Sequence, residues 1–347
     1  MNEGIGLCMS GGGYRAMVFH LGALWRLNEI GWLPKLDRIS SVSGGSIAAG
    51  VLAVHWKNLD FPAVVADIRR MAGATIDVGA VLKGVFLPGT ACNRVRDAYD
   101  KMLFHGATLQ DLPDRPRFVF DATNVQSAAL FRFSKPFVRD WKVGEIPNPR
   151  IPLAVAVAAS SAFPPVLSPL ELDPAKYGGD FHPAPPYPSK IVLTDGGVYD
   201  NLGLETVWKD CATVLVSDAG GDAAPEPEPH RDWPRHSYRV LDIIHNQVRA
   251  LRTRAIVEAY VRGERTGTFF SVRSDVTHYG LADALPCPIA QTAALAALPT
   301  RLKALTSAQQ ECLINWGYAV CDAAMRRHVD PSLPAPARFP FARGVAL

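Results

Sequence analysis

The sequence has 347 residues, of which 48% are hydrophobic and 20% are charged. A chain of this length and composition can bury a substantial core, which excludes an intrinsically disordered protein. The formal net charge is only +3 and no dense run of lysine or arginine occurs, so the sequence predicts no nucleic-acid partner.

Two units of strand, turn and helix form the N-terminal part of the chain. The apolar run 5–9 predicts a strand that stops at a glycine-rich loop, and apolar residues at helical spacing follow at 14–30. The apolar run 36–42 predicts a second strand, and the small, apolar residues 46–56 predict a buried helix. Two such units in succession favour an α/β fold with a parallel sheet at its core.

Patterns further along the chain continue this organisation. Strands are predicted at 117–124, 129–133, 190–194, 213–217 and 268–272. Helices are predicted within 61–105, at 149–162, as a long amphipathic helix at 238–264, and as a pair divided near Thr306 within 300–328. The apolar piece 76–87 suits either a lid or a core helix, and 222–233 is predicted to be an exposed loop. Linker composition occurs only inside loops, which predicts one domain.

The hexapeptide 41–46, Ser-Val-Ser-Gly-Gly-Ser, connects the second strand to its helix. A serine followed two residues later by glycine at a strand-to-helix turn is typical of a nucleophile elbow, and here these are Ser43 and Gly45. The N–H groups at the start of the helix would stabilise negative charge at the same point. A plain tight turn has the same composition, so this motif alone leaves both interpretations open.

The glycine-rich loop contains Gly11, Gly12 and Gly13, whose exposed N–H groups suit a phosphate or the oxyanion of a tetrahedral intermediate. Arg15 lies in the first helical turn, where a cation is unfavourable, which indicates either a functional purpose or a salt bridge. Ala16 stands at the last position of a dinucleotide fingerprint, and no acid follows at a strand end, so that motif is not met. No Gly-Lys-Ser/Thr follows either, which excludes a Walker loop.

Two aspartates follow predicted strands and precede glycines. Asp195 is followed by Gly196 and Gly197, and Asp218 has a similar context. Strand ends are where α/β proteins place functional groups, but an Asx turn explains either aspartate equally well. The residues themselves leave the choice between the two open.

None of the nine histidines has the context of a catalytic base. His20 and His245 lie inside predicted helices, and His278 lies on a late loop with no further support. This favours a carboxylate base, while a serine–histidine triad that uses His245 or His278 remains the alternative.

The chain shows no sign of export or membrane insertion. The N-terminus lacks a secretory signal, and the most apolar window, 151–167, is short and broken by prolines. The six cysteines are scattered without a CxxC pair, which is typical of buried thiols in a reducing compartment. We therefore expect a cytoplasmic protein, at most peripheral to a membrane, that needs no metal or other cofactor.

Taken together, these motifs resemble the patatin-like phospholipase family, which is related to the cytosolic phospholipase A2 catalytic domain. The resemblance runs from Ile5 to Ala219 in the family's order. Its parts are Gly-Gly-Gly-x-Arg at 11–15, Ser-Gly-Gly at 43–45, Ala-Ser-x-Ala-x-Pro at 159–164, and Asp-Gly-Gly at 195–197 with Asn201 after it.

The resemblance implies a three-layer α/β sandwich with a mostly parallel sheet and helices on both faces. It implies one catalytic domain at 1–330, with a motif-bearing core at 5–221, a C-terminal portion at 238–330 and a Pro/Ala-rich tail at 331–347. The implied activity is a serine acyl-ester hydrolase of the phospholipase A type, with a lipid or another acyl ester as its partner.

The resemblance also implies a role for each motif residue. These roles are nucleophile for Ser43, general base for Asp195, oxyanion hole for Gly11, Gly12 and Gly13, support of the anionic intermediate or phosphate for Arg15, and turn support for Gly45, Gly196 and Gly197. Ser10, Ala16 and Ser41 depart from the family pattern. These departures are the basis of an alternative, a non-catalytic lipid- or anion-binding protein that retains the fold.

Overall fold

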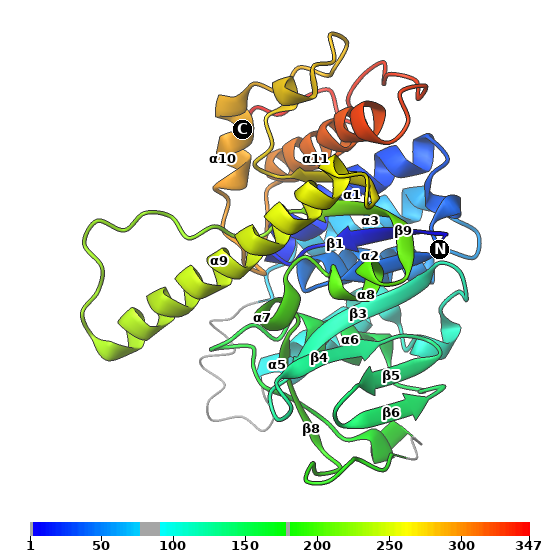
Figure 1. Ribbon diagram of the computed structural model, residues 1–347, viewed down its shortest axis with the longest axis vertical. Coiled ribbons are helices and arrows are strands. Elements are labelled where there is room, and N and C mark those ends of the chain that lie inside the picture. The colour runs from blue at the N-terminus through cyan, green and yellow to red at the C-terminus, as the bar shows by residue number, and fades with distance from the viewer. Residues whose placement is uncertain (1–2, 77–90, 178–180) are drawn as a thin grey trace.

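The structure, a computed structural model, describes residues 3–76, 91–177 and 181–347 (Figure 1). The predicted lid or core segment 76–87 therefore lies, apart from Ile76, outside the described residues. Within the described residues, one sheet forms the centre of the molecule, and its main path has the order β10-β9-β1-β2-β3-β4-β5-β6.

One half of this sheet is parallel. Its strands are β10 (Thr266–Ser271), β9 (Cys211–Asp218), β1 (Gly4–Met9), β2 (Arg38–Ser41) and β3 (Arg117–Asn124). All five were predicted from their apolar runs, and β3 has the bounds predicted for it. The predicted α/β class is confirmed, with a sheet that is mixed because its other half is antiparallel.

The antiparallel half begins at β3. It contains β4 (Ala129–Phe133), β5 (Phe137–Asp140), β6 (Gly144–Pro147), β7 (Leu170–Leu172) and β8 (Ile191–Asp195). β4 pairs with one edge of β3. The other edge of β3 pairs first with β2, which is parallel to it, and then with β8, which is antiparallel to it. Ser41 at the end of β2 pairs with Phe120, and Asp195 at the end of β8 pairs with Ala122. The carboxyl ends of β2 and β8 therefore meet.

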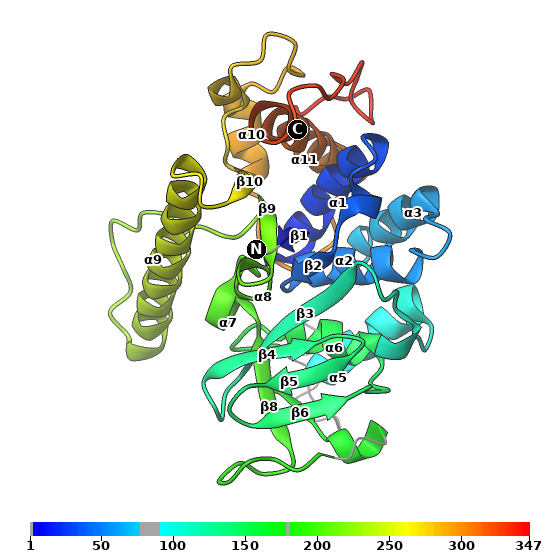
Figure 2. The ribbon, with the colours of Figure 1, turned by 45° about the vertical axis from the view of Figure 1, so that its right-hand side comes forward.

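Helices cover both faces of the sheet (Figure 2). One face carries α1 (Gly13–Glu29), α2 (Gly44–Val54), α3 (Phe61–Ala72), α5 (Ala91–Tyr99), α6 (Leu153–Ser160) and α11 (Ser307–His328), with α10 (Ile289–Ala296) packed on α11. The other face carries α7 (Gly197–Asp200), α8 (Glu205–Trp208) and α9 (Trp233–Val261). Short helical turns occur at Leu33–Lys35, Asp100–Phe104, Leu109–Asp111, Pro174–Tyr177 and Val276–Tyr279.

The two faces bury cores of different size. Leu7 and Met9 of β1 point into the larger core, which includes Trp316 of α11, while Cys8 between them points to a smaller core beneath α8. This alternation is the two-residue period of a strand with both faces covered. All six cysteines are buried and unpaired, as predicted.

The C-terminal helices differ from their prediction. Residues 300–328 were predicted to hold two helices, but they contain only α11, and the preceding helix, α10, ends at Ala296. Thr306 begins α11 as a capping residue, because its hydroxyl accepts the Gln309 N–H while the Gln309 side chain accepts the Thr306 N–H. Among the described residues, no helix is both long and apolar enough to span a bilayer.

Candidate active site

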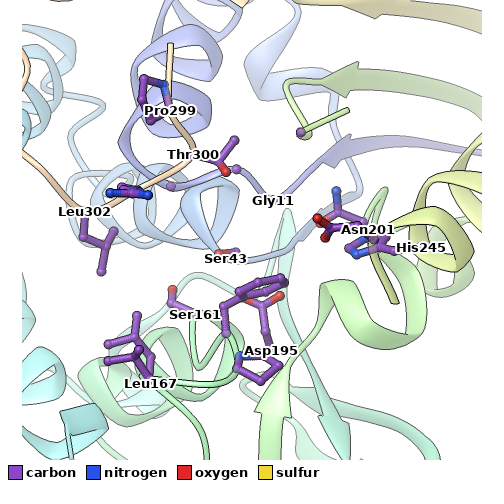
Figure 3. Close-up of a pocket in the computed structure, with 18 of the residues that line it drawn as sticks. Gly11, Ser43, Ser161, Leu167, Asp195, Asn201, His245, Pro299, Thr300 and Leu302 are labelled. Carbon is purple, nitrogen blue, oxygen red and sulfur yellow. The ribbon is translucent and has the colours of Figure 1, made fainter. Parts of the chain in front are cut away.

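A cavity of about 620 Å³ lies over the point where the ends of β2 and β8 meet (Figure 3). Ser43 and Asp195 line it together with Gly11, Gly12 and Gly13. The fold thus brings together the serine, the aspartate and the glycine-rich loop that the sequence analysis selected. Asp218 and Arg15 do not line this cavity.

Ser43 forms the turn between β2 and α2. Its backbone has φ 51° and ψ −118°, a conformation that L-residues rarely adopt and that raises the side chain above the sheet. Its N–H donates to the Ser160 hydroxyl at 3.0 Å. The turn is crowded, because a Cβ added to Gly45 would lie 2.4 Å from the Met9 carbonyl oxygen. This packing explains the glycine two residues after Ser43.

A chain of hydroxyl groups supports this turn from below. The Ser46 hydroxyl donates to Ser41 at 3.0 Å and lies 2.8 Å from the Ser160 hydroxyl, which in turn donates to the Asp121 carbonyl at 2.6 Å. The Ser41 hydroxyl donates to the Val119 carbonyl at 3.2 Å. Ser41, where the family usually has glycine, is therefore accommodated with its hydroxyl hydrogen-bonded. Ser160 was not predicted from the sequence as a support of the elbow, although it belongs to the Ala-Ser-x-Ala-x-Pro motif.

Asp195 presents a carboxyl group that is almost fully buried. Its Oδ1 accepts the Gly197 N–H at 2.7 Å, and its Oδ2 has no hydrogen-bond partner among the described residues. Burial raises the pKa of this carboxyl to about 7, although the Gly197 N–H and the nearby Ser43 side chain lower it. Gly196 allows the turn, since a Cβ there would lie 2.1 Å from the Asp121 carbonyl oxygen.

Asp218, the competing aspartate, has a different environment. Its Oδ2 lies 3.4 Å from the Arg249 guanidinium, and its Oδ1 accepts the Gly220 N–H at 2.8 Å. Both oxygens are occupied, and the carboxylate is neutralised by a cation. The choice that the residues left open therefore falls on Asp195 as the candidate base.

The glycine-rich loop offers two free donors. The Gly11 N–H donates to the Asn201 carbonyl at 3.1 Å, which removes it from the predicted set of oxyanion donors. The N–H groups of Gly12 and Gly13 have no hydrogen-bond partner in the described part of the chain. Gly12 has φ 146° and Gly13 has φ 59°, and both lie at the start of α1, where N–H groups favour a negative charge.

The hydrogen bonds of Arg15 do not fit its predicted role as a support for a bound anion. Its terminal nitrogens donate to Leu298 at 2.8 Å, to Ala219 and Gly220 at 2.9 Å each, and also to Ala296, in every case to a carbonyl oxygen. The four terminal N–H groups are therefore used within the protein. Arg15 therefore links α1 to the ends of β9 and α10. This geometry leaves no terminal N–H group for direct contact with a substrate phosphate.

The three histidines that the sequence analysis considered as bases lie in different environments. The His20 ring contacts the Ser217 hydroxyl at 2.8 Å and the Ser10 carbonyl at 2.9 Å, and burial lowers its pKa to about 4. The side chain of His278 is 82% exposed, and it does not line the cavity. His245 does line the cavity and its pKa is lowered by burial, but it makes no hydrogen bond with Ser43 or Asp195. Among the described residues, no group of side chains has the composition of a metal site.

Comparison with one known structure supports the fold. Human GIVD cytosolic phospholipase A2 in complex with methyl gamma-linolenyl fluorophosphonate aligns with 92% of this chain and 57% of that chain, at 14% sequence identity and a TM-score of 0.54. The same human enzyme in another structure aligns with 65% of this chain and 49% of that chain, at 14% identity and a TM-score of 0.44.

VipD from Legionella pneumophila aligns with 92% of this chain and 66% of that chain, at 14% identity and a TM-score of 0.41. The chain thus spans less than two thirds of each of these proteins. A comparison with curated proteins finds no match.

A comparison with protein families finds the model described as patatin-like phospholipase over residues 7–208. The match covers more than half of the sequence and includes the elbow, the glycine-rich loop and the Asp-Gly-Gly turn. The chain therefore belongs to the patatin-like phospholipase family.

Proposed function

We propose that the protein is a serine acyl-ester hydrolase of the phospholipase A type, with Ser43 as nucleophile and Asp195 as general base. One observation carries this proposal: a buried carboxyl with a pKa of about 7 and an unpartnered oxygen lines the same cavity as an elbow serine. A carboxylate of ordinary pKa is a weak base for a hydroxyl, whereas one near 7 matches the working pH.

The proposed reaction has two halves. The Asp195 carboxylate takes the Ser43 proton as Oγ bonds to the ester carbonyl carbon, and the carbonyl electron pair moves onto oxygen. The N–H groups of Gly12 and Gly13 hold this oxyanion, each good donor contributing roughly 3–4 kcal/mol. The intermediate then expels the alcohol, a lysolipid for a phospholipid substrate, which takes the proton from Asp195.

Water completes the cycle in the second half. Asp195 takes a proton from the water as its oxygen attacks the acyl-enzyme, and the second intermediate expels Ser43, which recovers that proton. The fatty acid leaves as the product. Gly11 contributes to this scheme indirectly, because its N–H holds the loop on the Asn201 carbonyl.

A fluorophosphonate probe tests the proposal directly. The Ser43 oxygen should bond to phosphorus and release fluoride, so that the peptide containing Ser43 gains the mass of the phosphonyl group. We expect one labelled site in the folded protein and none after heat denaturation.

His245→Gln should label at nearly the wild-type rate, with His278→Gln as an exposed control. Loss of labelling in His245→Gln alone would instead support a serine–histidine triad.

The departures from the family pattern no longer favour the non-catalytic alternative. Ser41 is hydrogen-bonded within the elbow, and the Ser10 hydroxyl accepts the Ala219 N–H at 2.7 Å. Ala16 is fully buried in α1. These residues support the loops on either side of the cavity without removing a candidate catalytic group.

Arg15→Lys should weaken the fold rather than substrate recognition. Lysine can donate at most three hydrogen bonds and lacks the planar fork, so we expect the free energy of unfolding to fall by about 2–4 kcal/mol in urea titrations. The ratio of kcat/KM for a phospholipid to kcat/KM for an uncharged ester with the same acyl chain should not change. A large fall in that ratio, at unchanged stability, would restore the direct phosphate role.

A further inference from the structure

The long helix α9 is the most exposed element near the cavity. It runs from Trp233 to Val261, and the residues it buries are Ile256 and Ala259, near its C-terminal end. The N-terminal part of the helix projects away from the sheet (Figures 1 and 2). It also lies beyond residues 7–208, the segment that matches the family.

Ion pairs hold the middle of α9, whereas Ile256 packs its C-terminal part into the smaller core. Arg249 lies 3.4 Å from Asp218, and Arg252 lies 3.7 Å from Asp200. These two arginines fix the middle of the helix to the strand ends and to α7. The exposed apolar side chains of α9, of the kind that normally attach a surface helix to its protein, are therefore free for another purpose.

Five exposed apolar side chains of α9 lie along one line, which we call the α9 stripe, and Val240, Ile243, Val257 and Val261 are exposed as well. The members of the stripe are Trp233, Leu241, Ile244, Val248 and Leu251, with exposed fractions of 81%, 62%, 50%, 39% and 51%. Their spacing of three, four, seven or eight residues places them on one helical face. A contiguous apolar surface of this kind is uncommon on a protein that remains free in water.

Four members of the α9 stripe, all except Leu251, line a groove beside the candidate active site. The groove has a volume of about 1100 Å³, and Phe163, Pro164 and Val198 form its opposite wall. Asn201 and His245 line both this groove and the cavity that contains Ser43 (Figure 3). The groove at the stripe therefore adjoins the cavity that contains the serine.

We propose that the α9 stripe docks on the surface of a phospholipid aggregate that carries anionic head groups, a role that rests on the proposed function. The side chains of the stripe remain largely open to solvent, which suits a broad surface better than one enclosed chain. Basic amphipathic helices with a tryptophan are typical of lipid interfaces.

A free cation at the edge of the stripe complements such a surface. Four of the five arginines of α9 form ion pairs with carboxylates of neighbouring segments, and these are the arginines at 235, 239, 249 and 252. Arg254 is exposed and forms no ion pair with any described residue, and it lies one turn from Leu251. Docking by this face would place the groove against the lipid and shorten the path of an ester to Ser43.

Vesicle binding by the Ser43→Ala protein tests this proposal without any catalysis. Sucrose-loaded vesicles of phosphatidylcholine with phosphatidylglycerol should sediment the protein, and vesicles of phosphatidylcholine alone should bind it more weakly. Ile244→Asn should weaken binding about tenfold, because one half-exposed side chain leaves the lipid. Ile243→Asn is the matched control, since Ile243 is also 50% exposed but does not line the groove.

The outcomes separate this proposal from the proposed function. Equal binding of the Ile244 and Ile243 variants, or no vesicle binding at all, overturns docking by the stripe and leaves the hydrolase proposal standing. A concentration-dependent dimer that Ile244→Asn abolishes, with no vesicle binding, assigns the stripe to a second copy and also overturns it. Absence of hydrolysis of a short, water-soluble ester overturns the hydrolase proposal while vesicle binding remains. Thermal unfolding of each variant verifies its fold.

Discussion

Asp195→Asn should lower kcat for a short soluble ester by about 10³–10⁴-fold, since the amide cannot take the Ser43 proton. In the wild-type protein, kcat/KM should rise with pH through about 7, because burial raises the pKa of the Asp195 carboxyl to that value and only the ionised form is a base. The residual rate of the variant should lack this inflection. A variant that retains the wild-type pH profile would assign the titrating base to another residue.

The same substitution should stabilise the protein at neutral and alkaline pH. A carboxyl whose pKa rises from 3.8 to about 7 on folding favours the folded state in acid, and this advantage is lost as pH rises between those values. At 1.36 kcal/mol per pH unit, the ionised carboxyl costs the fold roughly 4 kcal/mol above pH 7. Urea titrations at pH 8 should therefore show Asp195→Asn as more stable by about 2–4 kcal/mol, with the difference shrinking near pH 4. Equal stability of Asp195→Asn and the wild-type protein at pH 8 would contradict the burial of a charged carboxylate at this position.

Local patterns in the sequence were sufficient for most of the elements. The apolar runs at Arg117–Asn124 and Ala129–Phe133 predicted two strands at their observed bounds, because proline and polar residues flank the two runs. The error at 300–328 arose because Thr306 is a helix cap, and a cap shows where a helix starts but not whether a helix precedes it. The exposed apolar face of α9 was also missed, since periodicity predicts amphipathicity but not which face meets the protein.

The candidate site was harder to predict, because it depends on contacts between distant segments. The sequence selected Ser43 and Asp195 as candidates, yet their proximity results from β8 joining β3 beyond the end of β2. The choice against Asp218 depends on its ion pair with Arg249 in α9. The unfavourable helix position of Arg15 correctly indicated a special environment, but its partners are backbone carbonyls, which no residue pattern identifies.

Replacing Ser43 should separate the chemical role of the elbow from its structural strain. Both Ser43→Ala and Ser43→Gly remove the hydroxyl, so each should lower hydrolysis by about 10⁴-fold or more and abolish fluorophosphonate labelling. Labelling that persists in both variants at the wild-type rate would assign the nucleophile to another residue.

The two variants should differ in stability. Alanine must keep φ 51° and ψ −118°, whereas glycine adopts a positive φ readily. Relief of strain contributes about 1–3 kcal/mol, and the greater freedom of glycine in the unfolded chain offsets about 0.5–1 kcal/mol of it. We therefore expect the free energy of unfolding, measured in urea titrations, to be about 1 kcal/mol higher for Ser43→Gly than for Ser43→Ala. Because neither variant has a hydroxyl, such a difference would report backbone strain at the turn that presents the nucleophile. Equal stability of Ser43→Ala and Ser43→Gly would show that the turn is unstrained.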